Sequence, residues 1–469
     1  MQKTAEQQID FKRARTSGWL GVAMVCAVAI ACLLLLWSHN LIVNGSPFHR
    51  WPWRSVPWSR VYPLTILSCV PLMLAQILWR RKGLASIFIA LALLTATNIS
   101  LQIIDGALRN DRYDLERIVD LIHNPIVTSY FTEAVILARQ SHVLPFLADY
   151  PQLMDQFHMH ATQKPPGQIL YWYAWLQITQ DGGGSALFGA LGLALLASLS
   201  IPAIYWLART IFENSDEAPT IAAIAATLFA LSPSLVLYFP LFDSVYPAMT
   251  CAALASWLLA LRTGRAMWAI LCGLIFAAMF FLTFVPLVLG VTVVGYGVVV
   301  VAKRRANPRV AIRQALLVLG TIVAVYLALW LTTAYNPIAT FFAALRNERA
   351  LQAVFEIPHT YPHTMPSDVL DFFFGSAWVT LPVLQVWLMR RKASTEHNLL
   401  LLAGLFQIVL VTVAGLLRCE TSRIWTFMQP LALIPIAAEL ARWSPRQRAA
   451  MYIAMWMLLS AMFQNLEVH

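Results

Sequence analysis

The chain has 469 residues, of which 59% are hydrophobic and 12% are charged, and its mean hydropathy is +0.65. A soluble domain carries about twice that share of charged residues, so a single water-soluble core is excluded and lipid must cover most of the surface. The formal net charge of +10 comes from short basic runs between apolar segments, which is typical of membrane topology signals and argues against nucleic-acid binding.

The apolar runs predict an all-α, polytopic membrane helix bundle. A spanning helix needs about 20 mainly apolar residues, and about thirteen runs approach that length. Strands of a membrane barrel alternate in polarity, whereas these runs do not. The predicted spans are 19–37, 61–79, 84–104, 186–209, 219–237, 246–262, 266–283, 284–302, 313–333, 369–388, 397–416, 427–441 and 449–463.

Charge placement predicts the orientation of these spans. The first run follows Lys12, Arg13 and Arg15 and is long for a cleaved signal peptide, so it is predicted to be a membrane helix. An N-terminus in the cytoplasm brings every strong basic cluster to the cytoplasmic side. These clusters lie at 80–82, 262–265, 303–313, 390–392 and 442–448. The sequence therefore predicts a multi-pass protein of the cell (inner) membrane.

The same orientation leaves the longest loop, 105–185, outside the cytoplasm. This loop is too long to be a plain linker. Residues 130–147 carry apolar side chains at helical spacing, which predicts an amphipathic helix on the membrane surface. Two further external segments are predicted at 335–366 and 418–426.

The sharpest chemical signal lies within the long loop. His158, His160 and Lys164 precede a rigid Pro165-Pro166 turn. A lysine supplies a point charge for phosphate, and a histidine supplies a hydrogen-bond donor. The alternative interpretation is a lysine at a helix boundary.

Two other charged positions are candidates for function. Asp243 lies where one apolar run ends and the next begins, a place that is unfavourable for a carboxylate without a partner, although Asp is also a common helix N-cap. Arg423 shares its short external segment with Arg418 and Glu420. Arginine grips phosphate through two hydrogen bonds, whereas simple charge neutralisation is the alternative.

The long loop also carries carboxylates that are candidates for a general base. Asp105, Asp120 and Glu133 are among them, and their spacing does not choose one. His359 and His363 lack a third ligand at matching spacing, so the sequence predicts no metal site and leaves any cofactor unknown.

Taken together, these segments resemble the GT-C superfamily of membrane glycosyltransferases. The similarity is to protein O-mannosyltransferases and to the bacterial transferases that add aminoarabinose to lipid A. The match covers roughly residues 85 to 445 in layout. Four elements match in order: Tyr130 to Ala134, Lys164-Pro165-Pro166-Gly167, Asp243 followed by Tyr246 and Pro247, and Arg423-Ile424-Trp425 followed by Pro430.

The chain departs from this family pattern in two places. The family has an acid shortly before the loop tyrosine, whereas residues 123–129 contain none, so either Asp105, Asp120 or Glu133 substitutes for it or the chemistry is altered. Phe284 stands where the family often has a lysine. The predicted organisation is an N-terminal tail with two extra spans (1–83) and a GT-C-like transmembrane domain (84–469) with the external loop 105–185.

The resemblance implies transfer of a sugar from a polyprenyl-phosphate donor to an extracytoplasmic acceptor, which is an envelope glycan, a lipid or a protein. A phosphate leaves as a stable anion, so this reaction needs no general acid, unlike that of a glycosidase. It needs one base and cations for the phosphate. The expected roles are a loop carboxylate as base, Asp243 as an orienting group, and Lys164 and Arg423 with His158 and His160 as the phosphate site.

Three alternatives compete with this interpretation. A transporter or flippase places ionisable residues near the membrane midplane and often has internal repeats, neither of which is visible here. A glycan polymerase or ligase shares the many spans and a large external loop. A non-catalytic assembly subunit would explain the missing acid before Tyr130.

Overall fold

The computed structural model describes residues 2–46, 49–81, 83–110, 112–140, 142–354, 362–392, 395–418 and 420–468. Helices dominate these ranges, which confirms the predicted all-α class. The one sheet found in them pairs two short antiparallel strands, β1 (Gly45–Ser46) and β2 (His49–Arg50). The predicted pair of His359 and His363 is not tested, because His359 lies outside the described residues.

Among the described residues, eight helical segments are long and apolar enough to cross a membrane. The protein is therefore a membrane protein, as its composition predicts. The segments are Gly18–Trp37 within α1 (Gln2–Trp37), Trp58–Arg81 (α2, Trp58–Leu78, with η2, Trp79–Arg81), Leu84–Ala107 (α3), Gly182–Ile211 (α9, Gly182–Ser198, and α10, Ser200–Ile211), Phe242–Thr263 (η5, Phe242–Ser244, and α13, Tyr246–Thr263), Val285–Ala302 (η6, Val285–Leu289, and α15, Gly290–Ala302), Pro308–Thr333 (α16) and Glu396–Val413 (α20).

The other predicted spans contain helices that are shorter or less apolar, so the number thirteen remains a prediction. Three are short apolar helices: α11 (Ala218–Ala230), α14 (Ala266–Leu282), and η7 (Thr426–Met428) joined to α22 (Gln429–Leu440). The run 369–388 is divided between α18 (Met365–Phe374) and α19 (Thr380–Arg390), because Ala377 and Trp378 adopt positive φ angles of 62° and 54°. The last, α23 (Pro445–Asn465), has 21 residues but is less apolar.

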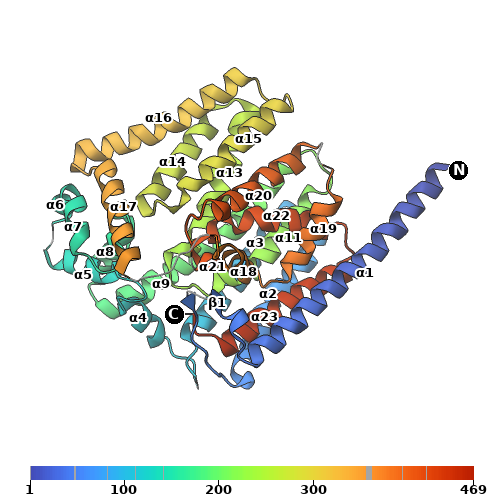
Figure 1. Cartoon of the computed structure of the whole chain (residues 1–469), viewed down its shortest axis with the longest axis horizontal. Helices are drawn as coiled ribbons and strands as arrows, with labels where there is room; N and C mark the ends of the chain where they lie inside the picture. Colours follow the sequence, from blue (N-terminus) through green and yellow to red (C-terminus); the bar gives the residue numbers. More distant parts are fainter. Residues whose placement is uncertain are drawn as a thin grey trace.

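Short helices fill the loop that follows α3. The predicted amphipathic segment 130–147 contains α5 (Tyr130–Gln140) and the start of α6 (Val143–Ala148). These helices gather with α17 at one end of the molecule (Figure 1). The remaining short elements are η1 (Leu41–Val43), α4 (Glu116–His123), α7 (Tyr150–Leu153), η3 (Met154–Gln156), η4 (Ala161–Gln163), α8 (Gly167–Thr179), α12 (Pro233–Val236), α17 (Pro337–Val354) and α21 (Thr421–Ile424).

The apolar surface of the bundle is turned outwards, as expected for a protein solvated by lipid. Helix α16 packs along α14 at the edge of the molecule (Figure 1). A Cβ at Gly273 of α14 would lie 2.8 Å from the Val318 carbonyl oxygen, so a glycine is needed for this close approach. The outer face of α16 exposes large side chains that include Leu316, Val323 and Leu331.

The basic connections between helices meet on one face of the bundle. Five ion pairs join them: Arg262–Glu396, Arg262–Glu213, Arg305–Glu396, Arg390–Glu439 and Arg442–Glu439. Connections that are far apart in the sequence, from residues 212–217 to 441–444, are thereby neutralised together. Four of the five predicted basic clusters contribute an arginine to these pairs, and their place on the cytoplasmic side stays a prediction.

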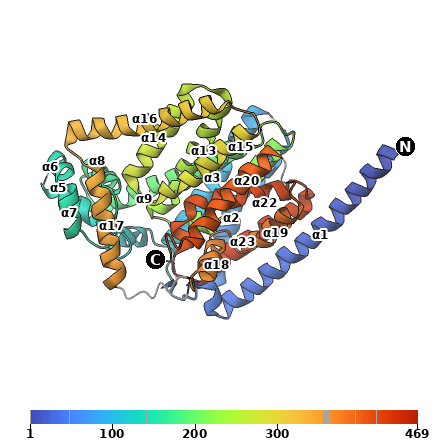
Figure 2. The same ribbon diagram turned by 45° about the horizontal axis from the view of Figure 1, so that its top comes forward.

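The hairpin after α1 and the end of the chain lie together near the C-terminal end of α3. Leu466 forms an isolated bridge with Trp53, and the backbone N–H of Glu467 donates to the Pro52 carbonyl at 2.9 Å. Figure 2 shows α1 and α23 running side by side towards this end of the bundle.

Candidate functional site

Three of the predicted site residues come together where the ends of several helices meet. The Nε atom of Arg423 lies 3.7 Å from Oδ2 of Asp243. The charges of both residues act on Lys164, which lies close to them. With Glu420, these residues form what we call the charged cluster: Lys164, Asp243, Glu420 and Arg423.

The backbone around the Pro-Pro turn fixes the position of Lys164. The residue is extended, at φ −118° and ψ 153°, just before α8 begins. Its carbonyl oxygen accepts a hydrogen bond from the Tyr150 hydroxyl at 2.8 Å. Gly167 allows α8 to begin against α14, because a Cβ there would lie 2.4 Å from the Phe281 carbonyl oxygen. Lys164 is therefore held next to the end of α14.

The ammonium group of Lys164 has an unusual environment. Its Nζ donates to Oγ1 of Thr283 at 3.3 Å, and within the described residues no carboxylate lies within ion-pair distance of it. Burial lowers the pKa of Lys164, while the charge of Asp243 opposes that shift. A partly buried cation that is hydrogen-bonded only to a hydroxyl favours an anionic ligand.

Asp243 lies in η5, immediately before α13. One turn further on, the hydroxyl of Tyr246 accepts a hydrogen bond from Nε2 of Gln168 at 2.7 Å, and the same amide group donates to the Leu282 carbonyl at 2.8 Å. The first turn of α13 is thus tied to α8 and to the end of α14. These contacts explain how Asp243 and Lys164, 79 positions apart in the numbering, become neighbours.

Arg423 is positioned by its partner Glu420. Its Nη2 lies 2.6 Å from Oε2 of Glu420, whose Oε1 lies 2.9 Å from Nε2 of His49 in β2. Burial opposes ionisation of Glu420, but Arg423 and His49 outweigh it and lower the pKa of Glu420 to about 2. Glu420 has a positive φ of 44°, a strained conformation that is frequent at functional sites.

Asp371 of α18 holds the short helix that carries Arg423. Its carboxylate accepts hydrogen bonds from the backbone N–H and the hydroxyl of Ser422 at 3.1 and 3.0 Å, and from the Thr421 hydroxyl at 3.2 Å. The Tyr238 hydroxyl also contacts the Ser422 hydroxyl. The guanidinium therefore projects from a firmly anchored turn.

The two predicted histidines have different surroundings. Burial lowers the pKa of His160, and the nearby charge of Arg423 lowers it further, so the ring is neutral at pH 7. Its Nε2 lies 2.9 Å from the Ile126 carbonyl oxygen, which makes that nitrogen the donor. His158 instead faces Glu133, with its Nδ1 2.7 Å from Oε1.

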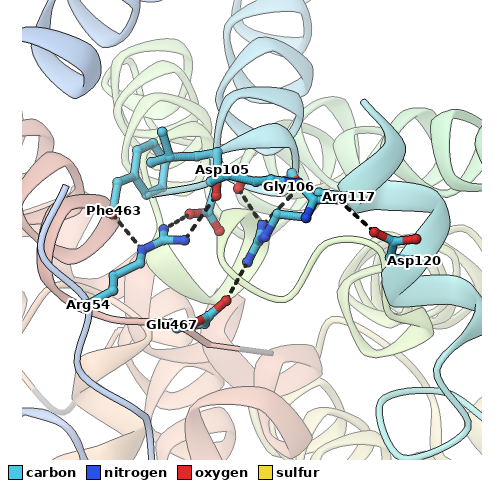
Figure 3. A network of polar contacts seen from close by, with 9 residues as sticks. Arg54, Asp105, Gly106, Arg117, Asp120, Phe463 and Glu467 are labelled. Atoms are coloured by element: carbon cyan, nitrogen blue, oxygen red, sulfur yellow. Dashed lines mark hydrogen bonds and ion pairs between the residues drawn. The ribbon is translucent and has the colours of Figure 1, made fainter. Parts of the chain in front are cut away.

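Asp105 and Asp120 belong to a different polar network, drawn in Figure 3. Asp105 is buried at the end of α3, where its Oδ1 lies 2.9 Å from Nη2 of Arg54. Asp120 is 66% exposed and pairs with Arg109 at 2.7 Å. The network borders a hollow of about 370 Å³ that Arg117 and Glu467 also line. The structure therefore does not bring these two carboxylates into the charged cluster.

Sequence reasoning did not single out several residues that complete the cluster. Glu420 has a visible signal, because an acid three positions before Arg423 is one helical turn away. His49 and Thr283 carry no such signal, because only folding brings them near residues that are distant in the sequence. No set of three or more His, Cys, Asp or Glu side chains in the described part of the chain is placed to hold a metal ion.

The chain was compared with protein-family models and with curated proteins. No family model matches the chain, and no curated protein matches it in sequence.

Proposed function

We propose that this membrane protein is a glycosyltransferase that moves a sugar from a polyprenyl-phosphate donor to an extracytoplasmic acceptor, such as an envelope glycan, a lipid or a protein. The observation that carries the proposal is the partly buried ammonium of Lys164, whose one hydrogen-bond partner among the described residues is the Thr283 hydroxyl. An anionic headgroup would supply the direct ionic partner that the ammonium lacks. Arg423 lies beside it and supplies a second cation.

The chemistry of such a donor suits the residues present. The bond from sugar to phosphate breaks with the phosphate leaving as an anion, so cations at the leaving oxygen lower the barrier. Lys164 and Arg423 take this role. Neutral His160 does not take the predicted role of phosphate donor, because its one N–H, on Nε2, already donates to the Ile126 carbonyl. Before the donor binds, Asp243 and Glu420 balance the charges of Lys164 and Arg423, and Asp243 orients the acceptor or the carrier once the phosphate has entered.

The membrane setting supports a lipid donor. A polyprenyl chain stays in the bilayer and brings its phosphate to the membrane surface, so the headgroup reaches the ends of helices by lateral diffusion. The charged cluster lies at helix ends, before α8, before α13 and in α21. We propose that this face is extracytoplasmic and that the face with the five basic ion pairs is cytoplasmic. The resemblance to GT-C enzymes at Lys164-Pro165-Pro166 is a second support.

A transporter or flippase for a lipid-linked sugar is the second candidate function. The same partly buried lysine favours it, because a flippase must also hold the phosphate. The two candidates differ in their product: an enzyme yields a glycosylated acceptor and free polyprenyl phosphate, whereas a flippase returns its substrate intact. A polymerase or ligase would instead use a glycan linked through pyrophosphate.

The deciding experiment is sugar transfer by the purified protein in lipid nanodiscs. Polyprenyl-phosphate donors with different radiolabelled sugars are supplied with an envelope extract as the source of acceptor, and released polyprenyl phosphate is measured. Lys164→Met is expected to abolish release, whereas Lys303→Met, an exposed lysine on the basic face, serves as the matched control and is expected to remain active. No release with any donor, or full activity of Lys164→Met, would refute the proposal.

A further inference from the structure

We infer that His158, oriented by Glu133, is the general base that takes the proton from the acceptor hydroxyl. This inference rests on the glycosyl transfer proposed above. Its starting point is that Glu133 is buried, with a side chain that is 5% exposed, whereas the side chain of His158 is 50% exposed. The Glu133 carboxylate is therefore covered by the protein, whereas the His158 ring is accessible to an incoming molecule.

The pair has the geometry of a carboxylate–histidine dyad. Oε1 of Glu133 accepts two hydrogen bonds, one from the backbone N–H of His158 at 2.8 Å and one from the ring Nδ1 at 2.7 Å. A carboxylate that accepts from Nδ1–H fixes the tautomer, so the lone pair is on Nε2. Nε2 has no hydrogen-bond partner in the described ranges, and it is the free basic atom of the pair.

The dyad is built next to the charged cluster. Glu133 and Tyr130 lie three positions apart on α5 and therefore on the same face of that helix. The Tyr130 ring packs edge-on against Phe242, the residue before Asp243, with the ring centroids 6.2 Å apart. The turn after His158 is also tied to the start of α5, because the Ala161 N–H donates to Oγ of Ser129 at 2.9 Å.

The other carboxylates are less suited to this role. Glu133 cannot reach an acceptor itself, because its Oε1 is occupied by two donors and its side chain is covered. Asp243 is engaged by Arg423, whose Nε lies 3.7 Å from its Oδ2. Asp105 and Asp120 are engaged by Arg54 and Arg109. A base at His158 also explains why no acid precedes Tyr130. In this protein the base comes from a later part of the loop.

The proton and the electron pairs balance in this step. As Nε2 takes the hydroxyl proton, the acceptor oxygen forms a bond to the anomeric carbon, and the bond from that carbon to the phosphate oxygen breaks. The electron pair leaves with the polyprenyl phosphate beside Lys164 and Arg423. The imidazolium that forms is stabilised by Glu133 and returns its proton to water.

The inference is tested with three variants in the nanodisc transfer assay. His158→Ala is expected to lower kcat by about 10²-fold or more, with the KM for the donor unchanged and with partial rescue by added imidazole. Glu133→Gln keeps an acceptor oxygen but loses the charge, so a smaller loss of kcat is expected. His142→Ala, an exposed histidine in the same loop, is the matched control. Full activity of His158→Ala, or a loss confined to the KM for the donor, would overturn the base role alone.

A second measurement does not need turnover. Diethylpyrocarbonate modifies the unprotonated Nε2 of histidine, and mass spectrometry follows the reaction at His158. The wild type is expected to react faster than Glu133→Gln, and equal rates would refute orientation by Glu133. A wild-type protein that reacts at His158 as expected but transfers no sugar from any donor would instead refute the proposed function, and the base role with it.

Discussion

Glu420 and Arg423 lie one helical turn apart, and Oε2 of the acid is 2.6 Å from Nη2 of the arginine. The other oxygen of Glu420 is 2.9 Å from His49 in the hairpin that follows α1. One partly buried carboxylate thus connects the N-terminal hairpin with the segment that carries Arg423. The guanidinium nearest to Asp243 depends on that connection for its position.

The first prediction concerns Glu420 and pH. Its pKa is lowered from 4.5 to about 2 in the folded protein. A lowered carboxylate pKa adds stability that is complete above pH 4.5 and is lost as the pH falls towards 2. Glu420→Gln is therefore expected to lower the melting temperature at pH 7, and the difference from wild type should shrink steadily below pH 4.5. Differential scanning fluorimetry in detergent checks this, and a difference that does not vary with pH would contradict it.

The second prediction separates stability from binding at Lys164. Burial lowers its pKa below the ordinary 10.5, so the protonated form destabilises the fold, and that effect disappears as the pH rises above 10.5. Lys164→Met is expected to raise the melting temperature at pH 7 while it removes binding of polyprenyl phosphate. Titration of Trp fluorescence with undecaprenyl phosphate measures the binding.

The pH dependence of that binding follows from the same shift. Because only the ammonium form attracts phosphate, affinity should fall with rising pH, starting at a lower pH than for an exposed lysine. Lys164→Arg should retain affinity over the same range, because a guanidinium does not lose its proton. Parallel curves for the wild type and Lys164→Arg would speak against a role of Lys164 in binding.

The third prediction is that Asp105 is structural. Its buried ion pair with Arg54 leaves one charge unpaired when either residue is replaced, which costs roughly 3–5 kcal/mol. Asp105→Asn should therefore destabilise strongly, whereas the double variant Asp105→Leu/Arg54→Met should recover much of the loss. Asp120→Asn breaks an exposed pair and is expected to cost less than about 1 kcal/mol. Unfolding by SDS titration measures all three variants.

The fourth prediction concerns orientation in the membrane. A variant without the native cysteines receives a single cysteine at Asp120 or at Lys303, both of which are exposed. A membrane-impermeant maleimide added to intact cells should label the cysteine at 120, and the cysteine at 303 should react only after the membrane is opened. Labelling of both from the same side would overturn the predicted topology.

Much of the helix pattern can be predicted from the sequence because a lipid-solvated helix must be apolar along its whole length. That requirement produces α3, α16 and α20 close to their predicted limits. It does not predict the break between α18 and α19, where Ala377 and Trp378 turn the backbone although their side chains are buried and apolar. Hydrophobicity alone carries no sign of such a turn.

The candidate site was also predicted only in part from the sequence. Lys164, Asp243 and Arg423 stand out because each is a charge beside apolar runs, and the fold brings them together. The carboxylates could not be ranked, because Asp105, Asp120 and Glu133 look alike as loop acids. Their partners are distant in the sequence: Arg54 is 51 positions from Asp105, and His158 is 25 positions from Glu133. Only the tertiary contacts distinguish an acid in a structural ion pair from one that orients a histidine.

The packing of α1 against α23 has a consequence for biogenesis. Trp37 donates to Gln464 across 427 positions of the chain, and Gly21 of α1 lies against the ring of Trp443. During synthesis α1 enters the membrane early, yet its long partner helix emerges only after nearly all of the other spans. Until then this flank stays open to lipid or to an insertion chaperone. The contact between α1 and α23 is therefore the last to form. Ribosome stalling before residue 445 should leave α1 accessible to crosslinkers in the bilayer.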